Sequence, residues 1–216
     1  MEPNNVAPPP WSLTGDGLVL LYHIPQGFNR QYGFMADFQH EAYRGWVGAV
    51  VLADYKTSGV RPYRELLYLP GLFRIGGSLT FSISRIFVST SDSVRNGQRN
   101  WGIPKELASF EVSSQPDGMQ TYRIGNAGNN FFEARVKPWG PRFPFSSRLI
   151  PFTHITQQLH NQLLRTRPVA SGSARVASLE YLAADPKFFP PVHQLKPLLS
   201  FYLPGFRMTF PAPRLL

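Results

Sequence analysis

The sequence contains no cysteine, so disulfide bonds, thiolate nucleophiles and cysteine-ligated metals are excluded. No apolar run approaches the roughly 18 residues that a membrane-spanning helix needs. The N-terminal residues 1–5 lack the basic and apolar regions of a signal peptide. We therefore expect no membrane association and a cytoplasmic location.

Charge is also scarce, because Asp, Glu, Lys and Arg together make up only 16% of the residues, below the usual quarter. This low content is typical of a chain that buries much of its surface, and we expect a homo-oligomer. The formal net charge of +9 comes from scattered arginines without a basic run, so we do not expect nucleic-acid binding, although charge keeps it as an alternative. A positive field equally suits an anionic substrate.

What the chain has in quantity is apolar and turn-forming residues. Hydrophobic residues make up 43% and aromatic residues 14% of the 216, enough to fill one core, so we expect a single domain over 1–216 with an extended segment at 1–10. The 21 prolines and 18 glycines are spread along the chain, which is typical of many short strands joined by turns.

Apolar runs and alternation predict most of the strands. We expect a loop and a short strand over 26–39, a loop over 138–151 and a short helix over 191–202, while 153–167 also shows helical spacing. A change of phase near Arg85 suggests a bulge. Strands are expected at 17–24, 46–55, 63–69, 78–90, 108–112, 121–124, 130–136 and 207–210. Such a pattern predicts a mostly β domain, either a barrel or a strongly curved antiparallel sheet.

One lysine stands out at the end of the segment 96–108, Asn-Gly-Gln-Arg-Asn-Trp-Gly-Ile-Pro-Lys-Glu-Leu-Ala. Trp101 and Ile103 can shield Lys105 from water, and Pro104 fixes the backbone just before it. Burial disfavours the ammonium form, and a neutral amine can attack a ketone to form a Schiff base. The alternative is a surface lysine whose aliphatic stem covers apolar side chains.

Two motifs carry a resemblance to a known family. Gly97, the pair Pro104-Lys105 and then Leu107 resemble the signature of the acetoacetate decarboxylase family, in which that lysine is the Schiff-base nucleophile. The segment 57–65, Thr-Ser-Gly-Val-Arg-Pro-Tyr-Arg-Glu, resembles the second active-site segment of the family. Acetoacetate decarboxylase is itself the established example of a lysine activated by desolvation or by a neighbouring cation.

The resemblance runs from about residue 10 to the C-terminus and implies both fold and chemistry. The implied fold is a closed β-barrel with a few short peripheral helices, usually assembled into oligomers, with extended structure over 163–168 and 174–181. The implied catalytic residues are Lys105, which adds to the ketone of a β-keto acid, and Glu65, which shuttles protons. Without the resemblance, Glu65 would be read as the partner of a neighbouring arginine, Arg64 or Arg61, at a solvated strand end. No cofactor or metal is expected.

Three positions depart from the family pattern. Glu106 stands where a second lysine is common, Asp16 where an arginine holds the substrate carboxylate, and Val50 where a further glutamate lies. We expect Arg99, or else Arg85, to take over the carboxylate. Tyr63, Val50 and Trp101 complete the expected substrate-binding set, and Val50 would suit a longer or aromatic keto acid or aldehyde.

The resemblance and the residues together predict a Schiff-base-forming carbon–carbon lyase that decarboxylates an acetoacetate-like β-keto acid through a lysine iminium. Two alternatives remain open. The same lysine could serve aldol condensation and dehydration, or the barrel could bind an apolar carboxylate without catalysis.

Overall fold

The computed structural model of the chain describes residues 6–126 and 128–216. The strands are β1 (Trp11–His23), β2 (Tyr43–Gly45), β3 (Val47–Thr57), β4 (Tyr63–Leu69), β5 (Leu72–Ile75), β6 (Ser78–Phe81), β7 (Arg85–Val88), β8 (Lys105–Leu107), β9 (Ser109–Ser114), β10 (Gln120–Asn126), β11 (Asn129–Ser146), β12 (Ile155–Leu159), β13 (Gln162–Thr166), β14 (Val169–Ala184), β15 (Leu199–Phe210) and β16 (Arg214–Leu215). The helices are α1 (Gln26–Tyr32), α2 (Asp37–Ala42) and α3 (Ser91–Trp101), with short 3-10 turns η1 (Ser147–Leu149) and η2 (Val192–Gln194).

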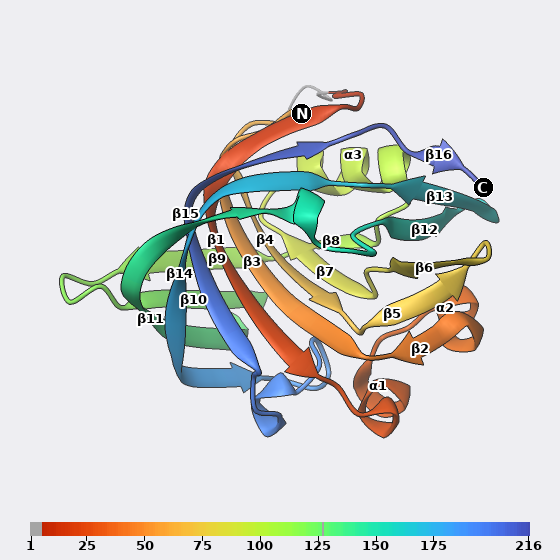
Figure 1. Ribbon diagram of the computed structural model, residues 1–216. Coiled ribbons are helices and arrows are strands. Elements are labelled where there is room, and N and C mark those ends of the chain that lie inside the picture. The colour runs from red at the N-terminus through yellow and green to blue at the C-terminus, as the bar shows by residue number, and fades with distance from the viewer. Residues whose placement is uncertain (1–5, 127) are drawn as a thin grey trace.

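A ten-stranded sheet dominates the fold and curls strongly upon itself (Figure 1). Its strand order is β8-β7-β4-β3-β1-β15-β14-β11-β10-β9, and a second, six-stranded sheet has the order β16-β13-β12-β6-β5-β2. The pairs β7–β8 and β12–β6 are parallel, and the other ladders are antiparallel. The prediction of a mostly β domain with a strongly curved sheet is confirmed. The ladder is not closed in the described residues, because the end strands β8 and β9 do not pair with each other.

The central strands are buried on both faces, because successive side chains of a strand point to opposite sides. Val50 and Leu66 pack into one apolar cluster, whereas Tyr55, Tyr63 and Ile86 pack into a second cluster on the other face. This two-sided burial explains why β1 and β3 read as continuous apolar runs in the sequence. The second cluster contains the candidate site.

The predicted strands are confirmed except that 78–90 is divided into β6 and β7, and four other expectations are wrong. Residues 26–39 hold α1 and α2, which have only seven and six residues and so show no clear helical period. Residues 138–146 continue β11, whose pairing with β14 shifts between Trp139 and Phe143, where Pro141 lies. Residues 191–202 form only η2 before β15 begins. The phase change near Arg85 is a passage from one sheet to the other, between β6 and β7.

The extended structure implied for the C-terminal half is confirmed. The segment 153–167 contains the hairpin of β12 and β13 rather than a helix, and residues 174–181 lie within β14.

None of the helices in the described part of the chain is long and apolar enough to cross a membrane.

Candidate active site

A cavity of about 190 Å³ lies on the face of the large sheet that carries the second apolar cluster. Its wall is formed by strands β1, β3, β4 and β7, by the end of α3 and by residues near the C-terminus. Lys105 and Glu65 are the charged residues of the wall, and Tyr55 and Tyr63 supply its hydroxyl groups. The rest of the lining is apolar, including both Trp11 and Trp101.

Sheet register brings these polar side chains together. Tyr63 and Glu65 are two residues apart on β4 and therefore point to the same face. Tyr55 on β3 is paired with Tyr63, and Ile86 on β7 is paired in parallel with Lys105, the first residue of β8. The polar groups of the cavity thus come from the paired strands β3, β4, β7 and β8. The apolar residues of these strands fix the pairing.

Lys105 is buried, with only 4% of its surface exposed. Its Nζ donates hydrogen bonds to Glu65 Oε2 at 3.0 Å, to Ser93 Oγ at 3.0 Å and, more weakly, to Tyr63 OH at 3.4 Å. The same nitrogen lies 4.9 Å from the ring centre of Tyr63 and 5.8 Å from that of Trp11. The alternative of a surface lysine is therefore wrong for this position.

Glu65 is buried as well and accepts weak hydrogen bonds from two phenols. Tyr55 OH lies 3.5 Å from Oε1 and Tyr63 OH lies 3.4 Å from Oε2. Burial, with the negative charge of Glu65 as the next cause, raises the pKa of Tyr55 and of Tyr63 well above 10.0. Both phenols therefore keep their protons and remain donors. The alternative partner Arg64 instead contacts Asp54 and the carbonyl of Phe110.

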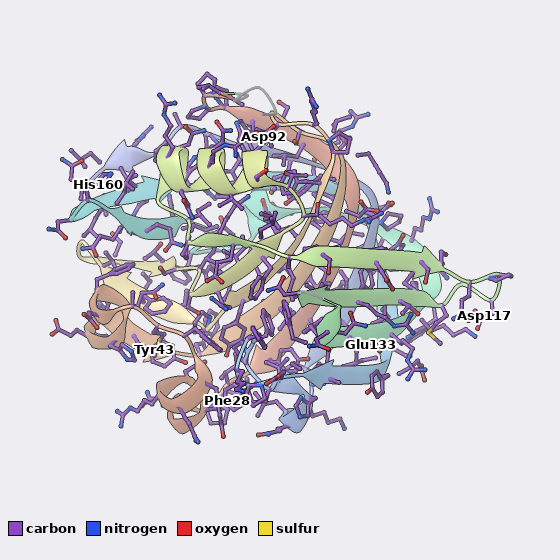
Figure 2. All side chains as sticks on the ribbon, turned by 180° about the vertical axis from the view of Figure 1, so that it is seen from behind. Phe28, Tyr43, Asp92, Asp117, Glu133 and His160 are labelled. Atoms are coloured by element: carbon purple, nitrogen blue, oxygen red, sulfur yellow. The ribbon has the colours of Figure 1, made fainter. Side chains whose placement is uncertain are left out.

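Helix α3 packs against the side chain of Lys105 and fixes its position. Thr90 caps its N-terminus by accepting a hydrogen bond from the Ser93 N–H, and Gly102 ends it in the left-handed conformation with φ 66°. Ser93 and Gly97 are four residues apart and so share the helix face that meets Lys105. Figure 2, which labels Asp92 in the first turn, shows α3 lying across the strands.

The structure brings four of the six predicted site residues together. Lys105, Glu65, Tyr63 and Trp101 all line the cavity. Arg99 does not, because it lies on the exposed side of α3.

Val50 is also misplaced by the sequence prediction, since it packs into the other apolar cluster and its neighbour Val51 lines the cavity. A shift of one residue on a strand exchanges one face of the sheet for the other.

The remaining charged candidates lie outside the cavity. Arg85 forms an ion pair with Glu106, whose side chain is 52% exposed, so the carboxylate next to Lys105 points away from the amine. Asp16, in the place of the family arginine, accepts a hydrogen bond from the Gly205 N–H.

Three residues of the site were missed by the sequence analysis. Ser93 precedes Gly97 by one helical turn, and recognition of α3 would have placed it beside the lysine. Tyr55 would have followed from pairing β3 with β4. Trp11 packs where a Cβ on Gly59 would come within 2.7 Å of its ring, so the glycine of the Thr-Ser-Gly turn makes room for the indole. No local signal in the sequence pointed to that long-range contact.

Comparison of the sequence with family models and with curated proteins finds no match. Solved structures do match. Acetoacetate decarboxylase from Legionella pneumophila is 14% identical with a TM-score of 0.73, covering 99% of this chain and 89% of that one. An acetoacetate decarboxylase-like enzyme from Sphingomonas wittichii RW1 is 10% identical, with a TM-score of 0.69 and coverage of 96% and 92%.

A third similar structure is the enduracididine biosynthesis enzyme MppR in complex with the condensation product of pyruvate and imidazole 4-carboxaldehyde. It is 16% identical to this chain, with a TM-score of 0.66 and coverage of 99% and 92%. At these identities the comparisons establish a common fold.

Proposed function

Because the chain has the fold shared by acetoacetate decarboxylase and MppR, we propose that it is a Schiff-base-forming carbon–carbon lyase. Lys105 is the nucleophile and Glu65 moves the protons. The observation that carries this proposal is the buried Lys105 Nζ, 3.0 Å from Glu65 Oε2 at the wall of an apolar cavity. The cavity of about 190 Å³ is smaller than the roughly 300–1,000 Å³ of pockets for drug-sized ligands, so the substrate is small.

Lys105 and Glu65 can together carry out every proton transfer needed to form the Schiff base. Glu65 takes one proton from the Lys105 ammonium, and the neutral amine adds to the carbonyl carbon. The proton on nitrogen moves to the oxygen to give a carbinolamine. Glu65 then protonates the hydroxyl group, water leaves, and the iminium remains beside the Glu65 carboxylate. Tyr55 and Tyr63 hold this carboxylate by donating to its two oxygens.

The iminium is the electron sink for the next step, and so the chemistry needs no bound cofactor. In a β-keto acid the bond to the carboxylate breaks, carbon dioxide leaves and an enamine forms. Glu65 takes up a proton from water and passes it to the enamine carbon, which regenerates the iminium for hydrolysis. The decarboxylases among the structures of the same fold support this outcome.

A second outcome is aldol-type chemistry. Here Glu65 removes a proton from the carbon next to the iminium, and the enamine attacks an aldehyde before water is lost. The apolar wall, which carries no arginine in the described residues, favours this outcome, as does the condensation product bound to MppR.

Reduction with borohydride tests the shared first step. We expect acetoacetate, pyruvate or a small ketone to leave a reduced adduct on Lys105, found by mass spectrometry of the digested protein. Lys105→Met removes the adduct, whereas Lys56→Met, at an exposed lysine, retains it. Modification of Lys56 and Lys105 to the same extent would contradict the proposal.

A further inference from the structure

The charges around the cavity indicate which class of substrate it can hold. This inference rests on the proposed function. We infer that the carbonyl compound held at Lys105 is uncharged: a small apolar ketone or aldehyde without a carboxylate. Among the described residues of the wall, Lys105 is the only cation and Glu65 the only anion, and they neutralise each other at 3.0 Å.

A carboxylate on the substrate would have no cation left to meet. The iminium keeps the single positive charge of Lys105, and the Glu65 carboxylate already balances it. A second carboxylate would be buried among apolar side chains next to the first, which is strongly unfavourable without a partner. The residues outside the described ranges, 1–5 and Ala127, include no lysine, arginine or histidine that could supply one.

Arg61, close to Tyr63 in sequence, is exposed and does not line the cavity, and three further arginines are also directed elsewhere. Arg64 alternates with Tyr63 and Glu65 on β4 and so lies on the opposite face, where it contacts Asp54. Arg85 is paired with Glu106, and Arg99 is exposed on α3. None of the three lines the cavity.

A groove that contains Arg148 and Arg207 adjoins the cavity, but neither arginine lines the cavity itself. Leu13 and Met208, paired across β1 and β15, contribute to both hollows. Arg207 alternates with Met208 along β15, so its side chain leaves the sheet on the other face. The carboxylate of a small ligand bound to Lys105 would have to cross the sheet to reach it.

A neutral substrate selects between the two outcomes proposed above. Loss of carbon dioxide requires a carboxylate on the substrate, whereas removal of a proton next to the iminium does not. Glu65 is placed to take that proton, since its carboxylate lies against the nitrogen that becomes the iminium. The reaction that follows is then addition of the enamine to a second carbonyl compound, or the reverse cleavage.

Two ligands of nearly equal shape test the inference. Levulinate and 5-methylhexan-2-one share a methyl ketone and two methylene groups, and end in a carboxylate and in an isopropyl group, respectively. Binding of each to the wild-type protein is measured by calorimetry, and adduct formation at Lys105 is measured by borohydride reduction. We expect the neutral ketone to bind and to react at least about tenfold better than levulinate, because its end group needs no cation.

The outcomes separate this inference from the proposed function. Equal or better reaction of levulinate at Lys105 would overturn the neutral substrate class and leave Schiff-base formation intact.

Because an apolar wall can also speed the decarboxylation of an acid that does enter, carbon dioxide release from acetoacetate is measured too. Release that depends on Lys105 would likewise overturn the inference. Selective binding of the neutral ketone without any adduct would uphold the substrate class and contradict the proposed function. Binding of neither ligand would contradict both.

Discussion

Gly97 on α3 lies directly against the aliphatic chain of Lys105. A Cβ at position 97 would come within 2.5 Å of Lys105 Cδ and 2.8 Å of Cε, too close for both groups to keep their places. The glycine of the motif is therefore explained by contact with the lysine eight residues later, since its own backbone is helical.

We expect Gly97→Ala to displace the lysine rather than to unfold the protein. The helix gains up to about 1 kcal/mol from the replacement of glycine, which offsets part of the cost of overpacking. Moving Nζ away from Glu65 should lower the rate of adduct formation at Lys105 at least about tenfold, because a small misplacement disrupts attack. Borohydride trapping and urea denaturation measure the two effects.

The matched control is Gly27→Ala, at a glycine of α1 whose added Cβ would meet no atom within 4 Å. It should leave adduct formation unchanged. Equal reactivity of both variants would show that contact with Gly97 does not position the lysine.

The Lys105–Glu65 pair should show strong coupling in a double-mutant cycle. Lys105→Met leaves the Glu65 carboxylate buried without its cation, and Glu65→Gln leaves the ammonium without its anion, so each single change should cost roughly 3–5 kcal/mol of stability. The double variant Lys105→Met/Glu65→Gln should regain a large part of that loss, because no buried charge remains. Denaturation of the four proteins measures the coupling, and additive losses would contradict the buried pair.

Alkaline pH should destabilise the fold through its buried tyrosines. Burial raises the pKa of Tyr55 and Tyr63 well above 10.0 in the folded state. Their stabilising contribution is fully present below the unfolded-state pKa near 10.0. It is lost as the pH rises towards the folded-state values, by up to about 1.4 kcal/mol per group and pH unit.

Denaturation between neutral pH and the alkaline limit measures this slope. Tyr55→Phe and Tyr63→Phe should each make the alkaline loss of stability shallower, because one ionising group is removed. Tyr181→Phe is the control, at a side chain that is 41% exposed. If the Tyr181 variant flattened the curve as much as the others did, burial would not be the cause.

Local sequence was enough to predict most of the strands, and the resemblance of two motifs pointed to Lys105 and Glu65. Tyr63 and Glu65 belong to one motif, and Gly97 and Lys105 belong to the other. The site residues that were predicted wrongly are those whose position depends on contacts between distant segments. Val50 and Val51 are equally apolar, and only the pairing of β3 with β4 decides which of them faces the cavity.

The same limit explains the missed helix. The segment 91–101 is mostly polar, so no apolar stripe marked it as α3, although Thr90 with Asp92 and Arg99 with Gly102 are signals of its two ends. Without the helix, Arg99 seemed to belong to a loop facing the substrate, and Ser93 could not be connected with the amine.

Arg99 therefore provides a direct test of the corrected site. Since its side chain is exposed on α3 and does not line the cavity, Arg99→Ala should leave ligand affinity and adduct formation within about twofold of the wild type. Calorimetric titration with both an anionic and a neutral ketone measures this. A loss of affinity for the anionic ligand alone would restore Arg99 as the carboxylate-binding residue.

Neighbouring valines on β3 offer a matched pair that separates the cavity from the core. Val51→Ala enlarges the cavity, and we expect the preference for a bulkier ketone over a smaller one to rise about tenfold, the usual effect of a methylene group in an apolar pocket. Val50→Ala opens a void in the opposite cluster, so it should cost about 2 kcal/mol of stability without changing that preference. Trapping rates with a series of methyl ketones and urea denaturation give the two readouts. A change of ligand preference in the Val50 variant, with none in the Val51 variant, would mean that the faces of β3 are assigned the wrong way round.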